Sequence, residues 1–515
     1  MTPQSPLFPL IGYRHRPALR LLIGCLLGIV LYESGYFLWG SIVLGALSII
    51  ALILSKRIPT IELLMWLSIV GILFGAYLSL RARPIDGLPL GSTLYQAPIR
   101  ILYPIGASAE SQIQYKAQIQ LPQGQWLTIQ LHSPKEISDC YGKEGRATLD
   151  LSSLNTITSR GYRNYLKSEG VQAEGHLHTL HTLQTMSHPP LISRLQRFRQ
   201  YLIDSFELQA HCHIPWQDRG LIYALALGDR SYLSKDLKKQ FAASGVAHIL
   251  AVSGYHLGIV YGLLSLLMGK LLWRHRYRHY RYGLILLFLV LYTLLTGASV
   301  ATVRALLMSS IILGAKLIDR PVDPIQMLSL ILLLLLLFHN PFAYYSIGLL
   351  LSVSAVWGIY TFAFLIKLYL RPHNRKLQWL STLIAISLSA QVGVLPILLT
   401  SFGTASLSFL WSNIPITILT SLLIPVALLS FLIVQVFGSL PTFLLIVLRY
   451  LASATETLTY LFTPEYYGIN LHAQLHPLVL LLYYPLVYLL YRKFYQYAFR
   501  HRMWHSKATQ RETFS

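Results

Sequence analysis

The sequence predicts a polytopic α-helical membrane protein with a small β-domain inserted on one side of the bilayer. Of its 515 residues, 54% are hydrophobic and only 12% are charged, about half the charged fraction of a soluble globular protein. Several windows of 18 or more apolar residues are long enough to cross a bilayer as helices. Between two blocks of such windows, residues 86–207 form a polar region that contains none.

The first apolar block predicts three spans, and the second block predicts about nine, which gives about twelve in all. Basic residues precede the first span and no small-residue cleavage site follows it, so we expect an uncleaved anchor rather than a signal peptide. The predicted spans are 19–32, 36–55, 61–80, 246–272, 282–297, 301–318, 324–338, 346–366, 378–400, 413–436, 441–461 and 475–491.

Alternating apolar and polar residues predict β-strands in the region 85–185. The stretches "IQYKAQIQL" and "QWLTIQLH" show this period, and turn-forming sequences such as "LPQGQ" separate them. We expect a small barrel or sandwich outside the bilayer. The linker at 190–215 predicts an amphipathic helix that lies on the membrane or packs against the β-domain. Its apolar face is formed by Leu191, Leu195, Phe198, Leu202 and Phe206.

The formal net charge of +22 would indicate a nucleic-acid-binding surface in a soluble protein, but its distribution favours a topological cause. With the N-terminus inside, the basic clusters at 56–57, 274–281 and 371–376 and the tail at 496–515 all fall on the cytoplasmic side, as the positive-inside rule requires. We therefore expect both termini in the cytoplasm. Residues 86–207 are nearly neutral and predict no phosphate-binding surface of their own.

The stretch "HILAVSGYHLGIV" at 248–260 combines polar and small residues in an apolar setting. On a continuous helix, Ser253 and His256 would share one face. Two interpretations stay open, a polar face that lines a wet cavity and close packing of a second helix on small residues. The small residues are Gly254, Gly258 and Gly262. A catalytic serine is disfavoured because Ala251 replaces the first glycine of a nucleophile elbow.

Charged residues within predicted spans are costly and usually line an aqueous path or pair with one another. Arg304 lies in "ASVATVRALLMSSIIL". We expect a pore-side or structural polar contact there, or a side chain that reaches the outer water. Arg449 and Glu456 are seven residues apart on one helix face and predict a structural pair.

No complete catalytic, cofactor or metal-binding set is evident, so we expect a protein that is not an enzyme. In "HLHTLH" at 176–181, Leu180 replaces the aspartate of a dinuclear zinc motif. The cysteines Cys25, Cys140 and Cys212 are too far apart for a zinc ribbon. The sequence around 228–231 predicts a capped turn between two helices, with Ser234 as the next N-cap. Prolines interrupt the spans at Pro396, Pro415 and Pro425.

Together these landmarks resemble the ComEC family of competence proteins over about residues 10–490. The stretch "ALALGDRSYLSKDLKKQFAASGVAHILAVSGYHLGIV" is similar to the family's central signature, including the turn Gly228, Asp229, Arg230 and Ser231. "GASVATVRALLM" and "SLSAQVGVLPILLTSFGTASLSFLWSNIPITIL" resemble two later motifs, and "SRGYRNYLKSEGVQAEGHL" resembles the end of the family's OB-like domain.

The resemblance implies an inner-membrane channel that passes single-stranded DNA into the cytoplasm during natural transformation. It implies a three-helix segment at 1–84, an extracytoplasmic OB-like domain at 85–185 and a channel domain at 216–495. The pore-lining or channel-supporting candidates are Ser253, His256, Arg304 and Gln391. The implied partners are single-stranded DNA, membrane lipid, a DNA receptor, and a cytoplasmic helicase or single-strand-binding protein.

The chain departs from the family in two places. At 341–352 it reads "PFAYYSIGLLLS", with apolar or aromatic residues where the family carries an aspartate and a glutamine. It also ends soon after the last predicted span, so we expect no C-terminal metallo-β-lactamase-like domain. Two other functions stay open, a small-solute secondary transporter and a relative that has lost DNA uptake.

Overall fold

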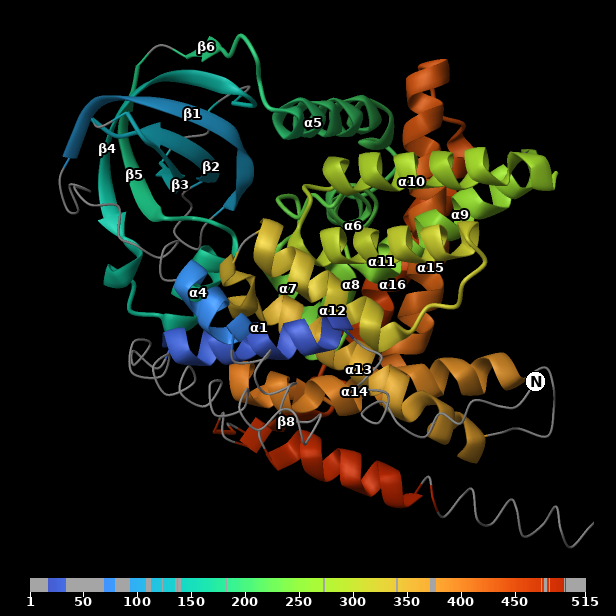
Figure 1. The fold of residues 1–515 in the computed structure, drawn as a ribbon. Coiled ribbons are helices and arrows are strands. Elements are labelled where there is room, and N and C mark those ends of the chain that lie inside the picture. Colours follow the sequence, from blue (N-terminus) through green and yellow to red (C-terminus); the bar gives the residue numbers. More distant parts are fainter. Residues whose placement is uncertain are drawn as a thin grey trace, which may run out of the picture. The chain divides into compact units, whose positions relative to one another are not determined.

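The computed structural model describes most of the chain and divides it into two compact units (Figure 1). Unit 1 comprises Met1–Ile203 and Val260–Ser346, and unit 2 comprises Asp204–Ile259 and Ile347–Ser515. The described residues are 17–33, 69–78, 93–107, 113–181 with short breaks, 183–271, 274–339, 341–370, 377–473 and most of 475–496. The predicted span at 36–55 and the basic tail beyond residue 496 lie outside them.

A closed five-stranded barrel forms the β-domain in unit 1. Its strands follow the order β1-β2-β3-β5-β4, and β1 also pairs with β4, which closes the barrel. Only the β3–β5 pair is parallel. The strands are β1 (Thr93–Ala107), β2 (Ile113–Gln120), β3 (Trp126–Ser133), β4 (Lys143–Ser153), β5 (Ala173–Leu180) and the short β6 (Gln184–Thr185), which pairs with β4. Of the two predicted arrangements, the structure has the barrel.

The alternation of residue types along each strand fills the barrel core. In β2, Tyr115, Ala117 and Ile119 are buried, while the polar residues between them are partly exposed. Ala117 pairs with Ile129 of β3, so apolar side chains from neighbouring strands meet inside. After β4 the chain forms η2 (Leu154–Thr156) and α4 (Arg160–Ser168) before it returns in β5. This excursion places α4 outside the barrel wall.

The other described helices of unit 1 are mostly apolar, apart from the basic η3 and the basic first turn of α10. They are α1 (Pro17–Glu33), residues 69–78, η3 (His275–Tyr277), α10 (Arg278–Leu295), α11 (Val300–Leu317), α12 (Pro324–Leu334), η4 (Leu335–His339) and η5 (Pro341–Tyr345). A Cβ atom on Gly28 of α1 would collide with the carbonyl oxygen of Gly71. The first and third predicted spans therefore pack closely through glycines.

The helix α5 (Leu191–Ala210) connects the barrel to the membrane helices of unit 1. Its Arg197 donates to the carbonyl of Tyr141 in the barrel, at 2.7 Å. Gln196, which is only 1% exposed, donates to the carbonyls of Leu294 and Leu295 at the end of α10, at 3.2 and 3.1 Å. The carbonyls at a helix end lack partners within the helix. That of Leu294 accepts from the Gly297 nitrogen at 3.2 Å, and Gln196 supplies a further donor.

The apolar face that the sequence predicts for α5 is split in the structure. Leu202 and Phe206 are buried, but Leu191 and Phe198 are exposed. Gln196 takes a buried place because it caps α10. Helical periodicity marks apolar positions and carries no information on a polar side chain buried by a hydrogen bond, so it could not place Gln196. The position of this helix on the membrane surface stays a prediction.

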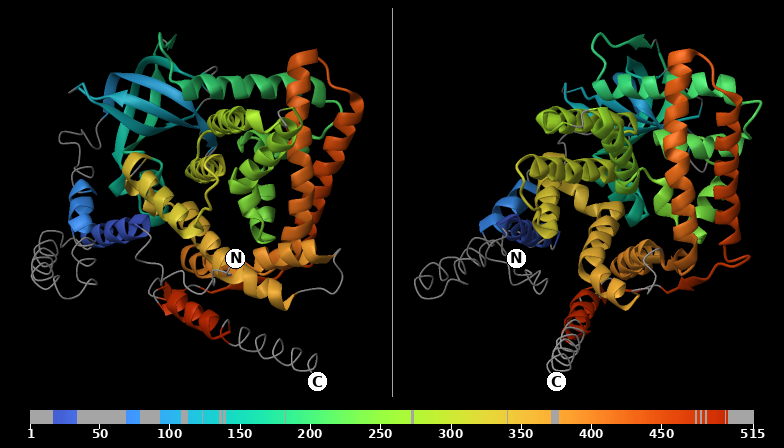
Figure 2. Two further views of the ribbon diagram at one scale, coloured as in Figure 1. Left: turned by 45° about the vertical axis from the view of Figure 1, so that its right-hand side comes forward. Right: turned by 90° about the vertical axis from the view of Figure 1, so that its right-hand side faces the viewer.

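The helices of unit 2 include two pairs of long apolar neighbours. Helix α13 contacts α14, and α15 contacts α16; the second pair stands side by side in Figure 2. The elements are α6 (Trp216–Leu227), α7 (Lys235–Ala243), α8 (Ala247–Leu250), the start of α9 (Gly254–Leu271), α13 (Ile347–Tyr369), α14 (Gln378–Phe402), β7 (Thr404–Ser406), α15 (Phe409–Phe437), α16 (Thr442–Leu461), β8 (Asn470–His472) and a last helix at 479–494.

Within the described part of the chain, five helices are long and apolar enough to cross a membrane, namely α11, α13, α14, α15 and α16. Two shorter apolar helices cover Ile69–Leu78 and Pro324–Phe338. The membrane character predicted from composition is therefore supported. The predicted span at 246–272 is not one helix, because α8 ends at Leu250 and α9 begins only at Gly254.

Small residues create a very close helix crossing between α13 and α14. A Cβ atom on Gly358 would collide with the carbonyl oxygen of Ser389, and one on Gly393 with that of Ser354. By contrast, no described atom lies within 4 Å of a Cβ built on Gly258 or Gly262. Gly258 and Gly262 therefore make no close helix contact with the described residues, and the close crossing occurs at Gly358 and Gly393 instead.

We expect Gly393→Leu to destabilise the α13–α14 pair. The new side chain must displace backbone atoms of the facing helix, and overpacking of this kind typically costs about 1–3 kcal/mol or more. The melting temperature of the purified protein in detergent should fall. Gly314→Leu in α11 is the matched control, because a Cβ there meets no described atom within 4 Å. Equal melting temperatures for the two variants would contradict the crossing.

Candidate functional site

The signature turn at 228–231 is a capped turn, as the sequence predicts. Gly228 ends α6 with a left-handed φ of 76°, a conformation that glycine adopts without steric cost. The Asp229 carboxylate then accepts hydrogen bonds from the backbone nitrogen and the hydroxyl of Ser231. Ser234 caps α7 by accepting from the Leu237 nitrogen at 3.1 Å. The turn folds back on α6, because a Cβ on Gly220 would meet the carbonyl oxygen of Tyr232.

Ser253 and His256 lie at the beginning of α9 and not on a continuous helix. Residues 251–253 are non-helical, and Ser253 precedes the first turn of α9. His256 Nδ1 lies 3.4 Å from the Ser253 backbone nitrogen, which donates to it, and 3.5 Å from the Ser253 hydroxyl. The geometry resembles the reciprocal bond of a capping box. The expectation of one shared helix face was wrong because a local cap interrupts the apolar run.

His256 brings the two parts of the central signature together. Its side chain is 0% exposed, and Arg230 and His248 both lie close enough to act on it electrostatically. The Nε2 atom has no hydrogen-bond partner among the described residues. Thus the turn at 228–231 and the stretch at 248–260 converge on one buried imidazole within unit 2.

Tyr255, which the sequence analysis missed, links α9 to α15. Its hydroxyl donates to the Thr417 carbonyl at 2.6 Å and lies 3.0 Å from the Thr420 hydroxyl. Farther along this polar group, the Thr417 hydroxyl donates to the Asn413 side chain at 3.2 Å. The Asn413 amide donates in turn to Ser387 of α14 at 2.9 Å. Side chains of α9, α14 and α15 thereby form one polar network.

The sequence contained two signals for this network. Asn413 and Thr417 flank Pro415 within the motif "WSNIPIT", and Tyr255 lies beside His256 in the central signature. Their types alone could not identify the bonds, because tyrosine and threonine also occur by default at membrane interfaces and in helix packing.

Gln391 lies in α14 one turn after Ser387 and is partly exposed. The next residue, Val392, has a carbonyl that cannot bond within the helix, since the residue four positions later is Pro396. Tyr483 of the last helix donates to this carbonyl at 2.8 Å, and Tyr484 donates to that of Gly393 at 2.9 Å. The proline interruption therefore faces protein, as a break in a membrane helix must face protein or water.

Arg304 lies in unit 1, whereas Ser253, His256 and Gln391 lie in unit 2. It occupies the second turn of α11, after a turn in which Gly297 and Ala298 both have positive φ. The side chain is only 4% exposed, and its Nη1 atom has no hydrogen-bond partner in the described part of the chain. A guanidinium always carries its charge in proteins, so α11 holds a fixed cation within an apolar helix.

Glu456 of α16 is hydrogen-bonded to Asp218 of α6. Arg449 also acts electrostatically on the Asp218 carboxyl group. Asp218 is 4% exposed. Burial and the neighbouring Glu456 charge raise the pKa of Asp218 to about 7, although Arg449 opposes the shift. The structure thus gives Glu456 a different partner, Asp218, and the predicted pair of Arg449 with Glu456 stays a prediction. Asp218 was missed because it is 231 positions from Arg449 in the chain.

The histidines of the barrel make local contacts. His176 stacks on His132 with ring centres 4.9 Å apart, and His178 Nε2 lies 2.7 Å from the Asp150 carboxylate. Hydrogen bonds from Thr93 and His178 lower the pKa of Asp150. Among the described residues, no three His, Cys, Asp or Glu side chains are arranged to hold a metal ion.

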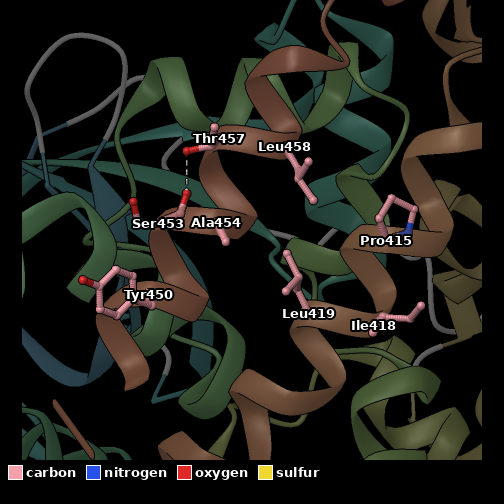
Figure 3. A pocket seen from close by; sticks show the side chains of 8 residues that line it. All are labelled: Pro415, Ile418, Leu419, Tyr450, Ser453, Ala454, Thr457 and Leu458. Atoms are coloured by element: carbon pink, nitrogen blue, oxygen red, sulfur yellow. Dashed lines mark hydrogen bonds between the residues drawn. The ribbon is translucent and has the colours of Figure 1, made fainter. Parts of the chain in front are cut away.

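A shallow hollow of about 630 Å³ lies between α15 and α16 (Figure 3). Its polar groups are few, and the Thr457 hydroxyl already donates to the Ser453 carbonyl at 2.8 Å. The lining residues are Pro415, Ile418, Leu419, Tyr450, Ser453, Ala454, Thr457 and Leu458. None is an acid, a base or a nucleophile beside a base, so the hollow does not have the composition of a catalytic pocket.

A family model described as "Competence protein" matches residues 225–495, which is more than half of the chain. The chain belongs to the competence protein family. The predicted membership in the ComEC family is thereby confirmed. The matched range includes the signature turn, the polar network and Arg304.

Two curated members of the competence family show similarity over part of their length. The chain is 34% identical to ComE operon protein 3 of Bacillus subtilis over 194 residues, which are 38% of this chain and 24% of that protein. It is 30% identical to Recombination protein 2 of Haemophilus influenzae over 220 residues, or 41% and 28% of the two chains. The matched segment thus spans about a quarter of each relative. No solved structure matches.

We expect Tyr255→Phe to lower stability, because it removes the bonds from α9 to Thr417 and Thr420. A lost intramolecular hydrogen bond typically costs about 1 kcal/mol, and the melting temperature in detergent should report it. Tyr467→Phe is the control, since Tyr467 is exposed and its hydroxyl makes no hydrogen bond among the described residues. An unchanged melting temperature for Tyr255→Phe would show that these hydrogen bonds contribute nothing to the stability of the helix packing.

Asp218 should make the stability depend on pH. Its pKa is higher in the folded protein than the usual 3.8, so the folded state binds the proton more tightly. The free energy of unfolding therefore falls as the pH rises from about 4 to about 7. Melting temperatures between pH 5 and pH 8 should decline for the native protein and less for Asp218→Asn. Asp236→Asn, at an exposed position in α7, should keep the native decline.

Proposed function

We propose that this protein is an inner-membrane channel that passes single-stranded DNA into the cytoplasm during natural transformation. The observation that carries the proposal is the convergence of the family signature on a polar network. The turn at 228–231 and the stretch at 248–260 meet at His256, and the neighbouring Tyr255 bonds α9 to α15. A polyanion that crosses hydrocarbon needs a polar or cationic lining of this kind.

The proposed topology of about twelve spans is supported by contacts within unit 1. Gln196 of α5 bonds the end of α10 that the basic clusters assign to the outside. At the opposite end of α10, Arg278 donates to the carbonyls of Lys316 and Leu317 and to the Asp319 carboxylate. The helix α4 packs against η5, which the same topology also assigns to the outside. These contacts agree with an extracytoplasmic barrel and cytoplasmic termini.

We propose that the barrel is an OB-like domain. A closed five-stranded barrel in which β3 runs parallel to β5 has the strand number and Greek-key connection of that fold. OB domains bind single strands chiefly by base stacking along a charged groove. The near-neutral charge of residues 86–207 favours capture through stacking over capture through phosphates.

Arg304 is the proposed cation of the channel, with Ser253, His256 and Gln391 as polar supporting residues. A buried guanidinium that lacks a carboxylate partner among the described residues can interact with a passing phosphate. No catalytic group is needed for this function, and we propose that the chain is not an enzyme. A DNA receptor and a cytoplasmic helicase or single-strand-binding protein are the proposed partners on the two sides.

Deletion of the gene in a competent strain, with labelled DNA followed in parallel, tests the channel. Transformants should vanish, and protected DNA should accumulate outside the inner membrane. An unchanged transformation frequency would contradict the proposal of a DNA channel. It would favour a small-solute transporter or a relative that has lost DNA uptake.

Arg304→Glu should reduce transformation at least tenfold, because a tenfold change corresponds to only about 1.4 kcal/mol and the substitution reverses a buried charge. Membrane insertion, followed by the amount of protein in the membrane fraction, should stay unchanged. Arg320→Glu is the matched control, since Arg320 is exposed beyond the end of α11. Normal transformation by a well-expressed Arg304→Glu variant would exclude Arg304 from the DNA path.

A further inference from the structure

Three aromatic rings lie together where the chain turns from α12 toward α13. Phe342, Tyr344 and Tyr345 belong to η5, and each is partly exposed. The ring centres of Tyr344 and Tyr345 are 4.5 Å apart. The ring centres of Phe342 and Tyr345 are 6.4 Å apart, and the angle between the ring planes is 16°. This group, called the 342–345 cluster below, occupies the segment that departs from the family pattern.

A basic helix lies against the 342–345 cluster. The helix α4 packs against η5, and the Lys167 ammonium lies 5.8 Å from the centre of the Tyr345 ring. Arg163 precedes Lys167 by four residues and so lies on the same face of α4. Residues 160–168 contain no acidic side chain. The cluster is therefore bordered by cations contributed by the barrel domain.

The other face of α4 carries two further rings. Tyr162 and Tyr165 are stacked with centres 6.4 Å apart and planes 22° apart, and Tyr165 is 49% exposed. Tyr162 is held in place, since Gln130 of β3 donates to its hydroxyl at 3.0 Å. One face of α4 thus carries rings of its own, and the opposite face lies against the rings of η5.

We propose that the 342–345 cluster and the Arg163–Lys167 face of α4 form a binding site for unpaired nucleobases of a DNA strand. Partly exposed rings beside cations are the combination that binds single strands without sequence preference, since bases stack on the rings and phosphates meet the cations. The site rests on the proposed function and adds to it the place where bases are held.

A membrane-interface belt also contains tyrosine, but a belt does not account for the basic helix packed on the rings. The amide and carboxylate of the family pattern would offer hydrogen bonds at 341–352, whereas the rings offer stacking faces. Stacking is worth about 1–3 kcal/mol per base, so the loss of one ring should weaken binding by about 5-fold to 150-fold.

The test compares two strands on the full-length protein in lipid nanodiscs. One is a fluorescent oligothymidylate of about 20 nucleotides, and the other is an abasic strand of the same length, which keeps the phosphates and lacks the bases. Tyr345→Leu should bind oligothymidylate about tenfold more weakly by fluorescence anisotropy and should bind the abasic strand as the native protein does. Tyr345→Phe, which keeps the ring, should retain native affinity for both.

Tyr467→Leu is the matched control, because Tyr467 is also exposed and lies outside α4 and η5. An equal loss of affinity for both strands in Tyr345→Leu would mean that the ring only supports the fold, and unchanged affinity for both would mean that no base stacks there. Either result overturns the proposal. The deletion strain tests the DNA channel separately. The binding site can therefore be disproved while the role in DNA uptake is confirmed.

Discussion

The constraint on which this structure depends is the need to satisfy every polar group that enters an apolar environment. Hydrocarbon offers no hydrogen bonds, so each freed carbonyl or buried hydroxyl must find a partner within the chain. The carbonyl of Val392, which Pro396 leaves unbonded, is met by Tyr483. The end of α10 is met by Gln196. Helix breaks and helix ends thereby become the points at which segments distant in sequence are joined.

Some buried polar groups nevertheless have no hydrogen-bond partner in the described part of the chain, and the same constraint makes each of them costly. Buried polar atoms without a hydrogen-bond partner occur at several described residues, and His256 Nε2 and Arg304 Nη1 are two of them. An unsatisfied buried group costs about 1–3 kcal/mol and more when charged, and such costs usually persist where function needs them. Both residues lie in the matched family range, and the role that we propose for them toward a passing ligand would account for this cost.

The sequence predicted the classes of structure well and the individual contacts poorly. Alternation identified β2 and β3 of the barrel, since a two-residue period reflects burial on one side of a sheet, and hydropathy identified the long apolar helices. The break at 251–253 escaped prediction because its cause is a local cap made by Ser253 and His256. The Asp218–Glu456 pair escaped because it joins residues more than 200 positions apart. Of the candidate residues, the capped turn at 228–231 could be predicted fully, since a glycine-aspartate turn is encoded locally.

The helix α5 has a mechanical consequence. It contacts the barrel through the hydrogen bond from Arg197 to Tyr141, and it contacts the end of α10 through Gln196. Arg197 and Gln196 are neighbours in the chain, so the contact to the barrel and the contact to the carboxyl end of α10 share one turn of helix. A displacement of the barrel relative to α10 must therefore strain one of these contacts, and the two elements are coupled through a single turn of backbone.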